Sequence, residues 1–156
     1  FAPRLISNAP AAILNIASVA CWINPASLGA YSAAHAALWA DDTTPDGFAW
    51  LDADDRASSV YSFLRSGGGG VVACVANLTP VPRHGYRLGL PRPGRWLGVL
   101  DTDDERWGGS GLVQREVTTD GTPWQGQPDS AVLTLPPLAV RWLAPADDGG
   151  PGGPVG

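Results

Sequence analysis

The chain has 156 residues, and its 15 acidic and 10 basic side chains give a formal net charge of -5. This length allows one ordinary domain with a hydrophobic core, and it excludes a catalytic (β/α)8 barrel of about 250 residues. The negative charge, and the lack of any block rich in lysine and arginine, argue against nucleic acid as a partner.

Residues 1–38 are rich in alanine and poor in charge, and they allow short helices at residues 11–21 and 27–38. The apolar run at residues 9–22 has only a faint likeness to a signal segment, because asparagine and proline interrupt it. No stretch approaches the roughly 20 apolar residues that a membrane span needs, so we expect no membrane partner. The chain does not begin with methionine, and we expect it to be a fragment.

The two cysteines, Cys21 and Cys74, are far apart in the sequence, and neither has a second cysteine or a histidine pair nearby. This spacing fits neither a disulfide framework nor a zinc site. We therefore expect a reduced, cytoplasmic protein that holds no metal and no cofactor.

From residue 39 onward the pattern changes to short strand-like runs separated by strong turn signals. The acidic and proline-containing run at residues 41–47 is typical of a turn. Strands are then expected at residues 59–65, 71–77, 85–90, 95–101, 112–119, 130–135 and 138–144. The glycines at residues 67–70 indicate that the first two of these strands form a hairpin. This pattern predicts an all-β sandwich or barrel, followed by a disordered Gly/Pro tail at residues 146–156.

Prolines stand at the ends of the predicted strands rather than inside them. Pro80 and Pro82 precede the strand at 85–90, Pro91 and Pro93 follow it, and residues 136–137 are a proline pair. Because proline cannot donate a hydrogen bond to a neighbouring strand, these positions stop strand pairing and stiffen the turns.

Catalytic sequence motifs for nucleophilic, nucleotide-binding or metal chemistry are absent from the sequence, which holds only two histidines, His35 and His84. His84 lies in a predicted turn, where a structural role is the simpler interpretation. Two acidic clusters, residues 51–58 and 100–107, bring together the carboxyl groups that glycoside cleavage requires. We interpret both clusters as solvated caps and turns, since nothing in the sequence buries one of their carboxyl groups or raises its pKa.

Seven tryptophans are many for a chain of this size. Trp107 and Trp124 lie in polar loops, where an exposed indole ring can stack on the flat C–H face of a sugar. These two residues are the candidate glucan contacts. The alternative is that their rings are mostly buried and cover the edge of the core. Trp50, Trp96 and Trp142 lie in or beside strand-like runs and are expected in the core or at its rim.

Three stretches of the sequence resemble a known family. They are FAWLDADDRASSVYSFLR at 48–65, VVACVANLTPVPRHGYRLGLPRPGRWLGVLDTDDERWGGSG at 71–111 and LTLPPLAVRWL at 133–143. Together they resemble the C-terminal β domain of bacterial 1,4-α-glucan (glycogen) branching enzymes of the α-amylase superfamily. The most specific string is TPVPRHGYR at residues 79–87. The structural motif residues of this region are Asn77, Pro80, Pro82, Arg83, His84, Tyr86 and Arg87. Departures from the family pattern include Leu78, Asp101 and Trp107, and residues 1–30 match poorly.

The resemblance implies an antiparallel Greek-key β-sandwich with a short, partly helical N-terminal segment. Residues 1–38 would be a remnant of the end of the catalytic barrel, residues 39–145 the C-terminal β domain and residues 146–156 the tail. The parent enzyme would move α-1,4-glucan chains to α-1,6 branch points with carboxylates of its barrel. No catalytic residue is therefore assigned to this chain.

The expected function is structural or accessory, with the missing barrel as intramolecular partner and an α-glucan of the glycogen or amylose type as a candidate ligand. Arg83, His84 and Arg87 are expected to bind neighbouring carboxylates and carbonyls rather than perform chemistry. Two alternatives stay open. One is a stand-alone carbohydrate-binding module that uses Trp107 and Trp124, and the other is a small glycosidase that uses acids such as Asp52, Asp54, Asp103 or Asp104.

Overall fold

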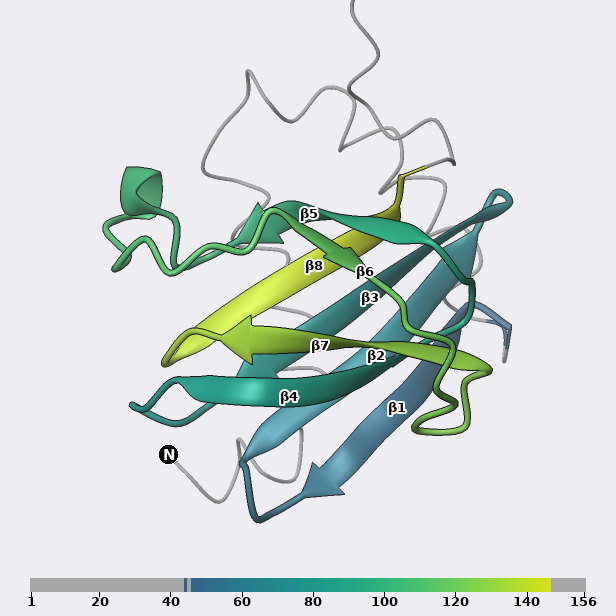
Figure 1. The fold of residues 1–156 in the computed structure, drawn as a ribbon, viewed down its shortest axis with the longest axis horizontal. Coiled ribbons are helices and arrows are strands. Elements are labelled where there is room, and N and C mark those ends of the chain that lie inside the picture. Colours follow the sequence, from purple (N-terminus) through teal and green to yellow (C-terminus); the bar gives the residue numbers. More distant parts are fainter. Residues whose placement is uncertain (1–43, 45, 147–156) are drawn as a thin grey trace, which may run out of the picture.

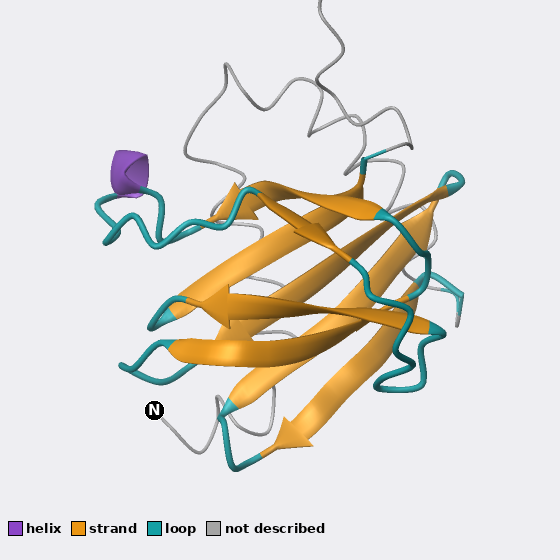
Figure 2. Cartoon of the chain, viewed as in Figure 1, coloured by secondary structure: helices purple, strands orange, loops and turns teal. Residues whose placement is uncertain are grey.

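The structure, a computed structural model, describes residue 44 and residues 46–146, and it is a sandwich of two antiparallel sheets (Figure 1). The larger sheet has the strand order β1-β2-β3-β8-β5-β6, and the smaller sheet pairs β4 with β7. The strands are β1 (Phe48–Asp55), β2 (Val60–Gly67), β3 (Gly70–Asn77), β4 (Arg83–Leu90), β5 (Arg95–Asp101), β6 (Glu116–Thr118), β7 (Asp129–Leu135) and β8 (Ala139–Pro145). The only helix in this part of the chain is a single 3₁₀ turn, η1 (Glu105–Trp107) (Figure 2).

The connections between the strands have Greek-key character. The chain passes from β3 in the larger sheet to β4 in the smaller one and back to β5, and β8 then inserts between β3 and β5. Strands that are distant in the sequence thus become neighbours, as in most β-sandwiches. The predicted antiparallel Greek-key sandwich is confirmed.

Most predicted strands are present, with ends shifted by one or two residues at most. The predicted hairpin is β2–β3, in which Gly67 pairs with Gly70 and the turn residues Gly68 and Gly69 have φ of 58° and 83°. Only glycine adopts such angles without steric cost, which explains the glycine run at this turn. The prolines Pro80, Pro82, Pro91 and Pro93 lie between strands, as predicted.

Two expectations about secondary structure were wrong. The first acidic cluster, residues 51–58, was expected to form caps and turns, but residues 51–55 belong to β1, with irregular register at Asp52, and only residues 56–58 lie in a turn. The strand expected at residues 112–119 is reduced to β6, because the residues before it bond elsewhere. The Leu112 amide donates to the Asp103 carboxylate, and the Gln114 side chain accepts from the Thr134 amide.

The core lies between the two sheets and consists mainly of aliphatic side chains. Leu64, Val71 and Leu143 come from the larger sheet, and Leu88 and Leu133 from the smaller one. Burying a side chain of this kind contributes about 1.5–3 kcal/mol, so this layer is the main source of stability. Trp96 is also fully buried here.

The predicted helices at 11–21 and 27–38, and the predicted tail apart from residue 146, lie outside the described residues. Within the described residues, no helix is long and apolar enough to cross a membrane.

Candidate functional site

The face of the larger sheet that points away from the core is aromatic. Side chains alternate between the two faces of a strand, so Ala73 and Val75 enter the core while Cys74, between them, points to the opposite face. In the same way Leu143 enters the core and Trp142 does not. We call this outer surface the aromatic face. Its members are Phe48, Trp50, Tyr61, Phe63, Val72, Cys74, Val99, Leu100, Val140 and Trp142.

Four rings of the aromatic face pack against one another. The Phe63 centroid lies 5.2 Å from that of Phe48, 5.7 Å from that of Trp50 and 6.1 Å from that of Trp142. The contacts with the two tryptophans are edge-to-face, which is a favourable geometry for aromatic rings. The sequence analysis placed Trp50 and Trp142 in the core or at its rim but missed the surface they form with Phe63. The sequence did contain a signal for this surface, because aromatic residues two positions apart, at 48 and 50 in β1 and at 61 and 63 in β2, lie on the same side of their strand.

Two reactive or charged groups are buried with these rings. Cys74 is a free cysteine whose thiol has a raised pKa because of its burial, although the nearby Arg65 acts in the opposite direction. A thiol of this kind is inert at neutral pH. Arg65 is 1% exposed and pairs in β2 with Phe48 on one side and Val72 on the other. The aromatic face thus combines apolar rings with one buried cation.

Asn77 joins two proline-containing loops at the end of β3. Its buried side-chain amide donates to the carbonyl oxygens of Val81 and Pro136, each at 2.8 Å, and its Oδ1 accepts from the Thr79 amide and hydroxyl. The loop that contains Pro80 and Pro82 is thereby held against the proline pair before β8. A buried side-chain amide whose donors and acceptor all have hydrogen-bond partners has a structural role.

The remaining residues of the motif lie in β4, and they have different surroundings. Arg87 donates to Asp120 at 2.9 Å and to the Ser130 hydroxyl at 2.7 Å. These hydrogen bonds from Arg87, followed by those from Thr122, hold the pKa of Asp120 well below its usual range. Arg87 therefore has the contact with a neighbouring carboxylate that the sequence analysis expected.

Within the part of the chain that the structure describes, Tyr86, Arg83 and His84 show no comparable pairing with a carboxylate. Burial, and secondarily the negative charge of Asp55, raise the pKa of Tyr86 to about 12, so its hydroxyl stays protonated. The Nε of Arg83 is buried and has no hydrogen-bond partner among the described residues. His84 is exposed.

Trp124 lies in a tight turn on the outer side of the smaller sheet, and it is 48% exposed. Trp124 and Gln127 pair through both backbone hydrogen bonds, and the Gln125 side chain accepts from the Gly89 amide at 2.9 Å. A Cβ atom at Gly89 would lie 2.3 Å from the Trp124 carbonyl oxygen, so only glycine allows the turn to sit this close to β4. Trp124 is thus an exposed ring on a rigid support.

Trp107 has different surroundings, although it was grouped with Trp124 on sequence grounds. It ends the η1 turn and is only partly exposed. The Arg106 guanidinium carbon lies 5.2 Å from the centre of its ring, and its indole N–H is buried without a partner among the described residues. One face of Trp107 is therefore occupied by a cation–π contact.

The second acidic cluster is committed to structural contacts. Asp101 is buried and accepts from Arg141 Nε at 2.7 Å, and Arg141 also donates to the carbonyl oxygens of Thr134 and Leu112. Asp103 accepts from the Ser110 amide and hydroxyl and from the Leu112 amide, at 2.7–3.0 Å. Burial alone would raise the pKa of Asp103, but these hydrogen bonds outweigh it and lower the pKa. A general acid needs the opposite shift.

The first acidic cluster is only partly open to solvent, because Asp54 is exposed whereas Asp52 and Asp55 are half-buried. Asp54 accepts from its neighbour Arg56 in an exposed ion pair, and Asp55 accepts from the Ser58 amide. In the described residues, no group of three or more histidine, cysteine, aspartate or glutamate side chains is placed to hold a metal ion.

Comparisons with known proteins agree with this architecture. The family profile described as "Alpha amylase, C-terminal all-beta domain" matches residues 50–146. The 1,4-alpha-glucan branching enzyme GlgB of Mycolicibacterium paratuberculosis is 51% identical over 115 residues, which cover 71% of this chain and 16% of the relative. The enzymes of the same name from Mycobacterium bovis (strain BCG) and Thermobifida fusca are 51% and 49% identical, over 72% and 69% of this chain.

The chain spans only 15–16% of the length of these curated relatives. The match includes the buried polar contacts around Asn77, Asp101 and Asp103 and every strand except the first two residues of β1. The chain belongs to the family of alpha-amylase C-terminal all-beta domains.

Proposed function

We propose that this chain is the C-terminal β domain of a 1,4-α-glucan branching enzyme, and that it supports the enzyme without catalysing glucan transfer. The domain itself would lie within residues 39–145, with residues 1–38 leading in from the catalytic part. The free, buried Cys74 is consistent with a cytoplasmic protein. The carboxylates of Asp101 and Asp103 are engaged in structural bonds, that of Asp54 is exposed in an ion pair, and that of Asp55 accepts from the Ser58 amide, which argues against a glycosidase.

The aromatic face carries this proposal. The centre of this face, formed by Phe63, Cys74 and Trp142, is buried within the chain, whereas the apolar residues around it are only partly buried. A partly exposed apolar border of this kind marks a surface for another protein element. Phe48 and Trp50 are only partly buried at its border, so they remain accessible to an additional layer. The proposed occupant is the catalytic barrel that the branching-enzyme resemblance implies, packed against this face within the same enzyme.

The first test measures activity. Purified chain is incubated with amylose, and iodine staining follows the loss of long unbranched segments. We expect no loss of colour, whereas a decrease in colour would show that this chain has catalytic carboxylates of its own.

The second test measures packing. The catalytic part of the M. paratuberculosis relative, truncated before its matching segment, is co-expressed with this chain, and association is followed by size-exclusion chromatography. Trp50→Ser in the aromatic face should weaken association at least tenfold, because a large buried ring is lost from the contact. Trp124→Ser is the matched control, since it removes an exposed ring from the smaller sheet. Equal association of both variants would place the contact elsewhere.

A second candidate function is glucan binding, and the exposure of Trp124 favours it. Its ring sits on a turn held by Gln125 and Gly89, and a rigid aromatic platform binds a sugar face with little loss of entropy. Maltoheptaose should change the intrinsic fluorescence of the chain. Trp124→Ala should remove this change, and Trp107→Ala should leave most of it, because Arg106 already covers one face of Trp107.

A further inference from the structure

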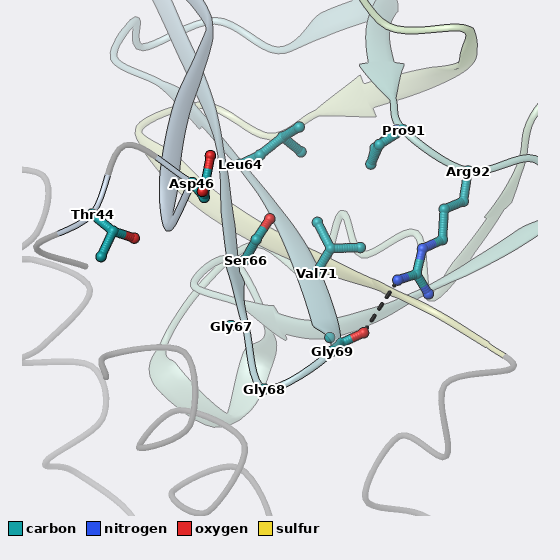
Figure 3. A pocket seen from close by; sticks show the side chains of 11 residues that line it. Thr44, Asp46, Leu64, Ser66, Gly67, Gly68, Gly69, Val71, Pro91 and Arg92 are labelled. Carbon is teal, nitrogen blue, oxygen red and sulfur yellow. Dashed lines mark hydrogen bonds between the residues drawn. The ribbon is translucent and has the colours of Figure 1, made fainter. Parts of the chain in front are cut away.

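The two ends of the sandwich carry different surfaces. At the end with the β2–β3 turn, an open hollow of about 650 Å3 is lined partly by polar side chains, among them Asp46, Ser66 and Arg92 (Figure 3). At the opposite end, the loop from β3 to β4 and the loop from β7 to β8 lie side by side (Figure 1). Three of the six large apolar side chains that are exposed in the described residues lie in these two loops. We call these three the loop surface: Leu78, Val81 and Leu138.

The loop surface is held in place by hydrogen bonds between the two loops. The buried Asn77 amide donates to a carbonyl oxygen of each loop, and the Leu138 amide donates to the Thr79 carbonyl oxygen at 2.9 Å. Residues 77–82 and 136–140 contain no charged side chain, although charged residues make up 16% of the chain. An uncharged apolar surface that is already fixed loses little entropy when a partner covers it.

Leu138 is unfavourable in the isolated domain for two reasons. Its side chain is 70% exposed, and its φ is 49°, in the left-handed region that leucine rarely adopts. Asparagine or glycine would adopt this backbone conformation with less strain. Because strained backbone conformations cluster at functional sites, the combination of strain and exposure indicates that the leucine side chain serves a contact outside this domain.

The loop surface adjoins the aromatic face. Ala76, near the end of β3, pairs with Tyr61 of β2 and with Val140 of β8, and both of these partners belong to the aromatic face. Leu78 lies two residues after Ala76, and Leu138 lies two residues before Val140. A partner that covers the aromatic face would therefore meet the loop surface next.

A cation lies at the base of the two loops. Arg83 begins β4 and pairs with Leu135, the last residue of β7, so one loop ends and the other begins at this pair. Arg83 is half-buried, and its Nε has no hydrogen-bond partner among the described residues. A guanidinium beside apolar side chains favours a carboxylate partner and repels a cationic one. The two loops therefore fit an apolar segment that also carries aspartate or glutamate.

We propose that the loop surface and Arg83 form a second contact with the catalytic part of the same enzyme, in which an apolar segment with a carboxylate covers Leu138. The identity of this partner rests on the proposed branching-enzyme function, whereas its apolar and acidic character rests on the two loops. The aromatic face lies on one side of the sandwich and the loop surface at its end. Contacts at both places would fix the orientation of the domain, which one face alone would not.

The test measures the affinity of the chain for the catalytic part of the M. paratuberculosis relative, truncated before its matching segment, by biolayer interferometry. Leu138→Asn should weaken binding at least tenfold, because the apolar contact is lost. The same variant should leave the urea midpoint of the isolated chain unchanged or higher, because asparagine tolerates a positive φ. Val132→Ser is the matched control, since Val132 is 46% exposed on β7, outside both loops, and this variant should bind as the unchanged chain does.

A further pair of variants tests the carboxylate. Arg83→Gln should weaken binding about threefold or more and reduce its dependence on salt, and Arg83→Glu should weaken it further. Arg95→Gln is the control for the loss of a cation elsewhere, since Arg95 is exposed and lies 3.7 Å from Glu116 of the neighbouring strand. Near-ultraviolet circular dichroism verifies that each variant is folded. Equal affinities of Arg83→Gln and Arg95→Gln would contradict a carboxylate at Arg83.

The outcomes separate this contact from that of the aromatic face. Loss of affinity in Trp50→Ser but not in Leu138→Asn would overturn the loop surface and leave the proposed function intact. A lower urea midpoint in Leu138→Asn would show a role in the fold and would overturn it as well. No binding of the unchanged chain would contradict both contacts. If sedimentation shows that the chain alone forms a dimer that Leu138→Asn abolishes, the partner is a second copy, which overturns the assignment to the catalytic part.

Discussion

The two acidic clusters are nearly the same in composition, LDADDR at residues 51–56 and LDTDDER at 100–106, yet they have opposite surroundings. In the first, Asp54 and its partner Arg56 are exposed. In the second, Asp101 and Asp103 are buried, and each accepts several hydrogen bonds. A run of acidic residues therefore does not by itself indicate whether it is a solvated surface or a structural centre.

The position of the strand within the sheet explains the difference. The first cluster lies on β1, an edge of the larger sheet, which has β2 as its only neighbour in that sheet. The second follows β5, which lies between β8 and β6, so Arg141 of β8 is placed directly opposite Asp101. Arg141 of β8 bonds Asp101, and the loop residues Ser110 and Leu112 bond Asp103, and these partners compensate for the desolvation of the two carboxylates.

The largest expected effect comes from Asp101→Ala. Removing this carboxylate leaves the guanidinium of Arg141 buried without its counter-charge, and breaking such a pair costs about 3–5 kcal/mol. Urea unfolding followed by tryptophan fluorescence measures the loss. The double variant Asp101→Leu with Arg141→Met is the control, and it should be more stable than Asp101→Ala. If the single variant is the more stable one, the buried pair is not what distinguishes the second cluster.

Asp103→Ala should have the next largest effect, about 2–3 kcal/mol, because the amides of Ser110 and Leu112 lose their acceptor inside the loop. The same urea experiment applies. Asp104→Ala is the matched control, since Asp104 caps the single turn η1 and otherwise forms ion pairs only with the exposed side chains of Arg106 and Arg115, so its loss should cost about 1 kcal/mol or less. Equal losses would mean that the Asp103 bonds are not the main support of the loop.

Gly109→Ala tests the close packing of the loop after β5, in which Gly109 lies against the backbone of Asp103. A Cβ atom at this position would lie 2.2 Å from the Asp103 carbonyl oxygen, so the loop has to move, at a cost of about 2 kcal/mol. Gly121→Ala is the comparison, because position 121 has open space around it but a φ of 78°, and we expect a cost of about 1 kcal/mol from backbone strain alone. A larger loss for Gly121→Ala would contradict the steric explanation.

The pH dependence of the fold's stability should also show the role of Asp103 in the second cluster. The folded-state pKa of Asp103 lies below its unfolded value, so this group stabilises the fold at neutral pH and loses that contribution as the pH falls from about 5 towards its folded pKa. Asp103→Asn should therefore lower the urea midpoint at pH 7 and reduce the further decrease between pH 5 and pH 3. An unchanged slope over that range would show that Asp103 is not an acid-sensitive group of this fold.

The smallest effect is expected from Asp54→Asn in the first cluster. Its ion pair with Arg56 is exposed on both sides, and such pairs contribute little in water. The melting temperature by differential scanning calorimetry should change by about 1 °C or less. A clearly larger decrease would mean that the two clusters are more alike than their exposure indicates.

Local sequence patterns determined much of this fold. The alternating apolar residues, the glycine run at 67–70 and the prolines around β4 depend on steric and hydrogen-bonding preferences of a few adjacent residues, so the strands, the β2–β3 hairpin and the loop positions could be predicted. The specific string TPVPRHGYR at residues 79–87 indicated the family. The whole of β1 was missed, and β6 was predicted too long, because the pairing of both strands depends on distant partners.

Only the tertiary structure decided which side chains of similar local sequence are buried and what they meet. Asp101 is paired because β8, forty residues later, inserts beside β5, and Trp124 differs from Trp107 because the Gln125 turn lies on Gly89 whereas Arg106 covers Trp107. The aromatic face likewise combines residues from several strands. Burial and charge pairing are properties of contacts between distant segments, and no local pattern encodes those contacts.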